Sequence, residues 1–447
     1  MSSTAVPKST TAPTPPAAGN ERLGRIGIIV LAICSATVIA DGYDVVVFGA
    51  VLPSLLQEPG WGLTPAGAGL IGSMALVGMF IGSMVSGPLT DRFGRRRMLL
   101  ICLAWFSVLT GACALAPTPE SFGLLRFLAG VGLGGVLPTA SALVAEYSSK
   151  RSRKLVYGIM FSGFPIGGIL AALVALVLIP AFGWRALFVV GLFPLLVIFP
   201  LAFRFLPESI AFLLARGRRA EAQAVAQRHQ LTLPASPPAD DSAVDDAREK
   251  KSPVAEILSR RYLVATICFC AASFLCLFMI YCLNTWLPQL MREAGYSLGS
   301  ALSFLLVFNI GAIVGTILIS TAADRMGSKV VITTTFLVAA VAVSLLAFAL
   351  PTAALYVLVG LGGAGVIATQ AFINAFVSEH YPVCIGATAL GWSMGIGRLG
   401  SIAAPPVLGL LIGSGLGLHW SFYAIAIPGL LGAAIIAFVP RKPAEVG

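Results

Sequence analysis

The chain alternates between long apolar runs and short polar loops. A helix that crosses a lipid bilayer needs about 20 mostly apolar residues, and the sequence of 447 residues contains twelve such runs. The pattern therefore predicts twelve membrane-spanning helices. Their expected ranges are 26–52, 67–89, 97–116, 121–146, 155–180, 184–206, 262–288, 298–322, 329–350, 353–378, 384–414 and 418–439.

Composition supports a membrane protein. Hydrophobic residues make up 57% of the chain and charged residues only 11%. A soluble domain carries about 25% charged residues, so too few charges are present to cover a soluble protein of this length. An ordinary soluble enzyme is excluded, and we find no nucleotide-binding loop or nucleophile–base set. The eight cysteines lie in or beside spans and the three histidines are scattered, so no metal site or cofactor is expected.

The positions of the basic residues predict a topology. Of the 29 lysines and arginines, 25 lie in loops and tails on the side shared by both termini, two on the other side and two inside spans. Since Lys and Arg near span ends stay in the cytoplasm, both termini and the long 207–261 segment are predicted to be cytoplasmic. The net charge of +10 is then a topology signal, and nucleic-acid binding is not expected.

The chain repeats itself at an offset near 233 residues. Asp91-Arg92-Phe93-Gly94 recurs as Asp324-Arg325-Met326-Gly327, and Leu52-Pro53 recurs as Leu287-Pro288 at an offset of 235. Six spans return the chain to its starting side, so the halves are parallel repeats, as in major facilitator transporters. We therefore predict an all-α integral membrane fold of two six-helix repeats. Its parts are a disordered tail (1–21), a first half (22–206), a linker (207–261), a second half (262–440) and a tail (441–447).

Four charged residues fall inside the predicted spans and away from their ends, where charge is costly and indicates function. Asp41 and Asp44 lie one turn apart on one face of the first span. Two carboxylates in a low-dielectric cavity cannot both ionise cheaply, so at least one is expected to exchange a proton. The alternative is that they form fixed salt bridges with Arg126 or Arg398.

The loop 87–97 resembles the signature loop of the major facilitator superfamily. A carboxylate at a short turn can accept hydrogen bonds from the start of a neighbouring helix and pair with arginine, while glycine permits close approach. Such a loop would latch the cytoplasmic ends of the two halves together when the site faces outward; alternatively, its arginines only set topology. The expected latch residues are Gly87, Asp91, Arg92, Gly94, Arg95, Glu146, Asp324 and Arg325.

The first span contains Ala40-Asp41-Gly42-Tyr43-Asp44, which resembles the signature of the aromatic acid:proton symporter family within that superfamily. Arg126 before a glycine-rich span and Arg398 in the eleventh span extend the resemblance over roughly residues 22–440. It implies the major facilitator fold and the import of an aromatic carboxylate, such as benzoate or a hydroxybenzoate, with protons. The proton gradient would replace any cofactor, and a monomer in the bacterial inner membrane is expected. The family often has arginine where this chain has Gly386, so any role of that arginine is absent or moved.

An aromatic acid needs a cation for its carboxylate and partners for its ring. A guanidinium can bind a carboxylate through two parallel hydrogen bonds. Arg398 is the preferred ligand, because its counterpart in the repeat is Pro165, and Arg126 is the second. Either could instead pair with an acid of the first half. The other candidates, which could also serve only in packing, are Tyr43, Phe164, Tyr281, Trp286, Asn309, Asn374 and Trp392.

Other functions stay open from the sequence. A symporter for another organic solute, such as a sugar or an aliphatic acid, would have the same organisation. A drug exporter is less favoured, as is a transporter-like sensor, because the 207–261 segment is too short and charged for a signalling domain.

Overall fold

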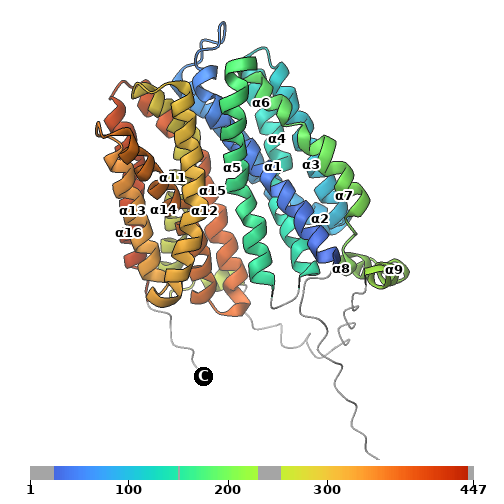
Figure 1. The fold of residues 1–447 in the computed structure, drawn as a ribbon. Helices are drawn as coiled ribbons and strands as arrows, with labels where there is room; N and C mark the ends of the chain where they lie inside the picture. The colour runs from blue at the N-terminus through green and yellow to red at the C-terminus, as the bar shows by residue number, and fades with distance from the viewer. Residues whose placement is uncertain (1–24, 149–151, 230–252, 441–447) are drawn as a thin grey trace, which may run out of the picture.

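A computed structural model describes residues 25–148, 152–229 and 253–440, apart from the side chains of residues 154, 229, 321–325 and 383. The two predicted tails, 1–21 and 441–447, lie outside the described residues. The described chain is a helical bundle (Figure 1), with twelve helices long and apolar enough to cross a membrane. This confirms the prediction of an all-α fold with twelve spans.

The first six spans form one half of the bundle. Their helices are α1 (Arg25–Leu55), α2 (Pro65–Phe93), α3 (Arg95–Ala112), α4 (Pro119–Tyr147), α5 (Arg153–Phe182) and α6 (Arg185–Val190) continued by α7 (Phe199–Phe205). The sixth span is interrupted between α6 and α7 by a π-helical turn at Pro194–Ile198. Proline lacks a backbone N–H group and so removes a helical hydrogen bond, which accounts for the break in a run that the hydropathy pattern predicts as continuous.

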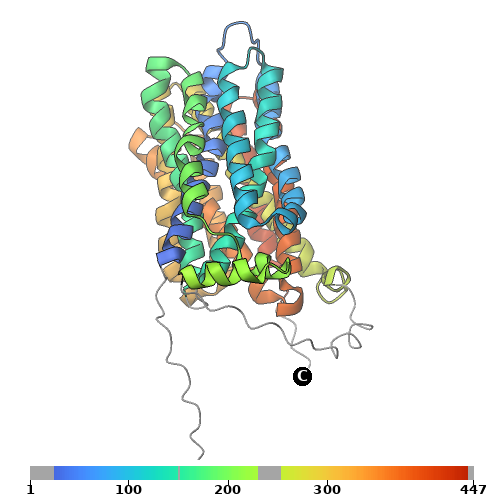
Figure 2. The same ribbon diagram turned by 90° about the vertical axis from the view of Figure 1, so that its right-hand side faces the viewer.

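The last six spans form the other half. Their helices are α11 (Leu263–Glu293), α12 (Leu298–Met326), α13 (Ser328–Leu345), α14 (Thr352–His380), α15 (Val383–Gly413) and α16 (Leu418–Ala437). The predicted linker contains three short helices, α8 (Ile210–Ala215), α9 (Arg219–His229) and α10 (Pro253–Ile257). Figure 2 shows α9 lying across the end of the bundle at which α1 begins.

We call the end where α1 begins and α16 ends the basic end, and the opposite end, where α1 leads into α2, the far end. Local signals fix the helix boundaries at both ends. At the far end, Thr64 caps α2 by accepting a hydrogen bond from the N–H of Gly67, and proline follows each cap of α2 and α4. At the basic end, Gly94 separates α2 from α3 with a φ of +95°, a conformation that favours glycine.

The two halves meet closely at the far end. A methyl group on Gly49 of α1 would lie 1.9 Å from the backbone oxygen of Asn284 in α11, and one on Gly69 of α2 would lie 2.4 Å from that of Pro405 in α15. Gly158 and its repeat counterpart Gly391, both toward the basic end, have no atom within 4 Å of such a group. Among the glycines that the structure describes, no comparable backbone approach joins the halves at the basic end. The bundle is therefore closed at the far end.

Candidate functional site

A buried ion pair joins α1 to α4. The guanidinium of Arg126 donates through Nη1 to Oδ2 of Asp44 at 2.7 Å, and through Nη2 to the backbone oxygen of Asp44 at 3.1 Å. The hydroxyl of Thr110 in α3 donates to the other carboxylate oxygen, Oδ1, at 2.5 Å. All three residues are at most 2% exposed. Asp44 is thus a fully partnered carboxylate held by three helices.

Apolar groups enclose this pair. The rings of Phe48 and Phe188 each lie 6.0 Å from the guanidinium carbon of Arg126. Tyr43, an expected partner for a substrate ring, turns toward the same side and donates its hydroxyl hydrogen to the backbone oxygen of Leu187 at 2.9 Å. Because water is excluded, the attraction between the charges is stronger than at a surface. Removing one partner would leave a costly unpaired charge.

Asp41 has a different environment, although it lies only one turn from Asp44. It is fully buried, and neither carboxylate oxygen has a hydrogen-bond partner within the described part of the chain. Arg398 of α15 and Tyr281 of α11, both from the second half, interact with it electrostatically. Arg398 is only partly buried, and its guanidinium has no hydrogen bond or ion pair with any described residue. An acid and a guanidinium without bonded partners therefore lie near the boundary between the halves.

Asn309 and Phe164 lie where neighbouring helices cross closely. The side-chain amide of Asn309 fills the space beside Gly168, so α12 and α5 touch there across the boundary between the halves. It also donates to the backbone oxygen of Leu305 at 2.9 Å. Phe164 belongs to the crossing of α5 and α1, where its backbone packs against Gly42. Both contacts are compatible with a packing role.

Two other candidates from the second half, Trp286 and Asn374, make hydrogen bonds to residues other than Asp41 and Arg398. Trp286 is fully buried and donates from Nε1 to the backbone oxygen of Pro405 at 3.0 Å, which is an internal contact of that half. Asn374 accepts from Nε2 of Gln370 at 3.2 Å. Neither contact brings the residue to Arg398 or Asp41.

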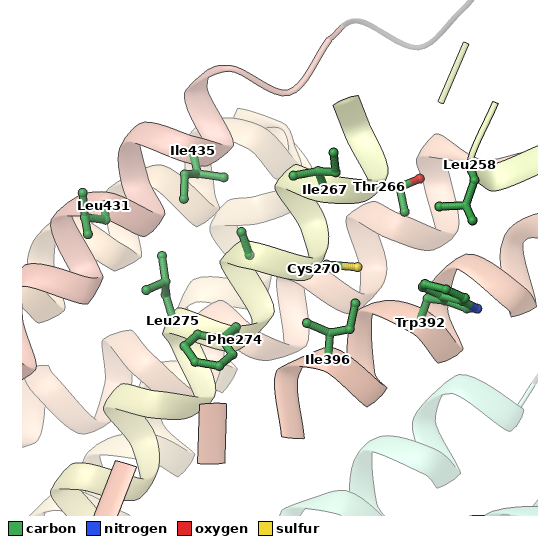
Figure 3. Close-up of a pocket in the computed structure, with 11 residues that line it drawn as sticks. Leu258, Thr266, Ile267, Cys270, Phe274, Leu275, Trp392, Ile396, Leu431 and Ile435 are labelled. Carbon is green, nitrogen blue, oxygen red and sulfur yellow. The ribbon is translucent and has the colours of Figure 1, made fainter. Parts of the chain in front are cut away.

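Trp392 lines an apolar cavity of about 530 Å³ between α11, α15 and α16 (Figure 3). The other lining side chains labelled in Figure 3 include Phe274, Ile396 and Leu431, and none carries a charge. A carboxylate site needs a few convergent polar groups in addition to an apolar wall. None of the residues that line this cavity belongs to the first half, and we do not assign the substrate to it.

The expected latch residues form a network at the basic end of the first half. The guanidinium of Arg95 lies 3.4 Å from Glu146, which also accepts from the hydroxyl of Ser209 at 2.7 Å. Glu208 accepts from the backbone N–H of Arg96, in the first turn of α3, at 3.0 Å. Its carboxylate lies directly over Gly94. Negative charge is favourable at the start of a helix. The sequence predicts Asp91 as the acid at the start of α3, and the structure has Glu208 there.

Asp91 itself contributes through its backbone. Its carbonyl oxygen and that of Arg92 accept from Arg216, at 3.3 and 2.9 Å. The Asp91 carboxylate is exposed and makes no hydrogen bond or ion pair with any residue that the structure describes, and Gly87 faces open space. The side chains of Asp324 and Arg325 lie outside the described residues. Among the residues that the structure describes, every contact of this network is within the first half and the segment after it.

Three functional contacts could not be found from the sequence. One is Thr110, a hydroxyl in an apolar span. The second is the cap by Glu208. The third is a clasp at the far end, in which Glu58 accepts from Arg185 Nη1 at 2.6 Å and from Trp184 Nε1 at 2.7 Å. Burial raises the pKa of Glu58, but the hydrogen bonds from Trp184 and Arg185 and the charge of Arg185 outweigh it and hold the pKa below its ordinary value.

The fold and the buried charges between its halves define a twelve-helix membrane transporter, and the comparisons agree. The sequence matches the Major Facilitator Superfamily over residues 33–405 and again over 307–447. It is 34% identical to the benzoate transport protein of Acinetobacter baylyi, covering 92% of this chain and 89% of that protein. It is 36% identical to the gentisate transporter of Corynebacterium glutamicum, covering 90% and 85%.

A solved structure shows the same fold. The crystal structure of a D-xylose–proton symporter superposes with a TM-score of 0.72 at 17% identity, covering 93% of this chain and 98% of that one. The chain therefore belongs to the major facilitator superfamily, in the family that contains the benzoate and gentisate transporters. The predicted family is confirmed, and so is its classification with transporters and not with enzymes.

Proposed function

We propose that this protein imports an aromatic carboxylate, such as benzoate or a hydroxybenzoate, together with protons. It would act as a monomer in the bacterial inner membrane, with both termini in the cytoplasm, by exposing a site between its halves alternately to the two sides. The observation that carries the proposal is the electrostatic interaction between Asp41 and Arg398 of the other half, neither of which has a side-chain hydrogen-bond partner among the described residues.

Arg398 is the residue proposed to bind the substrate carboxylate. Arg126, the second candidate, already donates from both terminal nitrogens to Asp44, so its guanidinium is not free for a substrate. Arg398 is partly exposed and keeps its donors for a bidentate contact. Tyr281, which lies within electrostatic range of Arg398, would contact the ring. The relatives named for benzoate and gentisate support an aromatic carboxylate as the substrate.

Asp41 is the residue proposed to carry the proton. An ionised carboxylate without a donor is expensive in an apolar interior, so the neutral acid suits the surroundings of Asp41 in this conformation. Asp44, with a donor on each oxygen, suits a permanent charge. An ionised Asp41 would attract Arg398 and compete with the substrate carboxylate. Proton and substrate would then enter together, and loss of the proton on the cytoplasmic side would let Asp41 displace the substrate from Arg398.

Uptake into proteoliposomes tests this function. Purified protein is reconstituted, a pH gradient with the acid side outside is imposed, and labelled benzoate is followed against protein-free liposomes. We expect accumulation that a protonophore abolishes. Arg398→Gln should weaken apparent affinity by about 50-fold, since it removes a charge-assisted bidentate contact. Arg292→Gln, at the far end of α11, is the matched control and should transport normally.

The same assay has outcomes that contradict the proposal. Benzoate flux that ignores the pH gradient would indicate a facilitator. Uptake of a sugar or an aliphatic acid in place of benzoate would contradict the proposal that the substrate is an aromatic carboxylate. Normal affinity of Arg398→Gln for benzoate would show that Arg398 does not bind the substrate carboxylate.

A further inference from the structure

Thr110 donates a hydrogen bond to the buried Asp44–Arg126 pair, and the proposed transport cycle assigns no role to this residue. Its hydroxyl donates to Oδ1 of Asp44 at 2.5 Å, on the opposite side of the carboxylate from Arg126. Thr110 is 1% exposed, so water cannot replace this donor. A hydrogen bond to a carboxylate favours the ionised form over the neutral acid. Thr110 is therefore placed to influence the protonation of Asp44.

The position of the hydroxyl is fixed by a close contact. A methyl group on Gly191, just after α6, would lie 2.4 Å from the Cγ2 methyl of Thr110. The threonine side chain thus rests directly on the backbone of the sixth span. Its methyl occupies the space left by the glycine, and its hydroxyl faces α1.

The internal repeat supports a specific role. An offset of 233 carries Thr110 onto Val343 and Arg126 onto Val359, and an offset of 235 carries Asp44 onto Met279. These three counterparts are buried, at most 2% exposed. Valine, which resembles threonine in shape but lacks the hydroxyl, thus occupies the same place in the half whose counterpart positions hold methionine and valine instead of an ion pair. The hydroxyl accompanies the charge and is not a requirement of packing.

We propose that Thr110 keeps Asp44 ionised, and thereby decides that Asp41 is the member of the aspartate pair that carries the proton. This inference rests on the proposed function, in which Asp41 carries the proton and Asp44 keeps its charge. The charged and titratable groups around Asp44 are Arg126 from α4, Asp41 and Tyr43 from α1, and Cys113 after α3. Arg126 holds the negative charge from one side, and Asp41 opposes it when ionised. The Thr110 hydroxyl adds to the effect of Arg126.

The proposal makes a prediction about one limb of the pH profile. Uptake falls in alkali when Asp41 loses its proton, and in acid when Asp44 gains one and its pair with Arg126 breaks. Thr110→Val removes a hydrogen bond to a charged group, worth roughly a tenfold change in proton affinity. We expect its acid limb to move up by about one pH unit while the alkaline limb stays in place. Thr110→Ser keeps the hydroxyl and should retain the acid limb of the unaltered protein.

Infrared titration of the reconstituted protein gives a second readout. The carbonyl band of a protonated carboxyl group is assigned to Asp44 by its loss in Asp44→Asn, and it should grow in at higher pH in Thr110→Val. If Thr110→Val does not reach the membrane, Thr110→Cys, a weaker donor, should shift the band in the same direction. A valine or cysteine variant whose Asp44 stays ionised over the same pH range as the unaltered protein overturns the inference.

The outcome also separates this inference from the proposed function. If Asp44→Asn loses proton-driven accumulation but Thr110→Val leaves the titration of Asp44 unchanged, only the role of Thr110 fails. If Asp41→Asn accumulates benzoate normally in response to the pH gradient, Asp41 does not carry the proton and the proposed function itself must be revised.

Discussion

The two halves of the molecule place very different side chains at equivalent positions of the same helical framework. In the first half, α1 and α4 bury Asp44 against Arg126. The repeat carries these residues onto Met279 in α11 and Val359 in α14, which are 0% and 2% exposed. Asp41, the unpartnered acid, is carried onto Cys276, which is also fully buried. One half thus holds a cluster of charges at its centre where the other holds an apolar core.

This difference shows that the framework does not depend on the charges. Helices α11 and α14 bury methionine and valine at the positions where α1 and α4 bury an ion pair. A buried ion pair is weak support for stability, because desolvation offsets most of the attraction between the charges. The charges of the first half are then best explained by function. The second half contributes a single intramembrane cation, Arg398, which has no acid beside it in its own half among the residues that the structure describes.

Removal of Arg126 alone from the Asp44–Arg126 pair should have the largest effect on stability and uptake. Arg126→Val leaves the Asp44 carboxylate buried without its counter-charge, which costs about 3–5 kcal/mol. We expect a large fall in the thermal unfolding temperature in detergent, together with loss of uptake.

The matched control replaces three residues of the first half by their counterparts in the second half. The triple variant Asp44→Met, Arg126→Val and Thr110→Val removes both charges and the hydroxyl together. It should be at least as stable as the unaltered protein, since hydrophobic replacement of a buried ion pair is often neutral or stabilising, yet it should not accumulate benzoate. Instability of the triple variant equal to that of Arg126→Val would show that the pair is structural.

The closed far end offers a comparison between two glycines. Gly49→Ala would place a methyl group 1.9 Å from the backbone of Asn284, whereas Gly391→Ala meets nothing within 4 Å. Overpacking costs about 1–3 kcal/mol, so Gly49→Ala should disfavour the closed far end and lower the initial rate of uptake by roughly tenfold. Gly391→Ala should keep the normal rate. Equal rates at matched expression would contradict the assignment of the α1–α11 contact to a closed state.

Breaking the clasp at Glu58 should give the smallest effect, and that effect should depend on pH. Because the folded protein lowers the pKa of Glu58, the unfolded protein binds the proton more readily. The stabilising contribution is therefore complete above the ordinary value of about 4.5 and is lost as the pH falls through the lowered pKa. Glu58→Gln should lower the unfolding temperature by a few degrees at pH 7, with the difference disappearing in acid. A difference that persists at low pH would mean that the carboxylate charge is not its source.

The sequence predicted the spans and the repeat well, because both depend on local patterns. Runs of apolar residues near the bilayer thickness mark helices whatever their partners are. The sixth span was also predicted, at 184–206, but not the π-helical turn inside it, since hydropathy does not register the hydrogen bond that Pro194 removes. The charged residues were also found in advance, because acids and arginines are rare in apolar runs.

Pairing of the aspartates with Arg126 or Arg398 was one of the alternatives open from the sequence, and the structure shows it for Asp44 and Arg126. Which aspartate would have which partner could not be predicted. Both aspartates share one helix face, and only the approach of α3 and α4 decides that Asp44 receives Thr110 and Arg126 while Asp41 receives neither. Many of the spans are apolar on all sides, so the sequence does not indicate which face points to a cavity. The sequence therefore did not indicate that Trp392 lines an apolar cavity with residues of α11 and α16. The cap of α3 by Glu208 depends on how the chain after α7 returns to the bundle.

The central claim is that Asp41 couples the proton to the substrate through Arg398. It is tested most directly by comparing Asp41→Asn with the unaltered protein in proteoliposomes, in two assays on the same preparation. Asparagine mimics the protonated acid, so Asp41→Asn should exchange labelled for unlabelled benzoate across the membrane but should not accumulate benzoate in response to a pH gradient. The unaltered protein should do both. Gradient-driven accumulation by Asp41→Asn at the normal level would contradict the account.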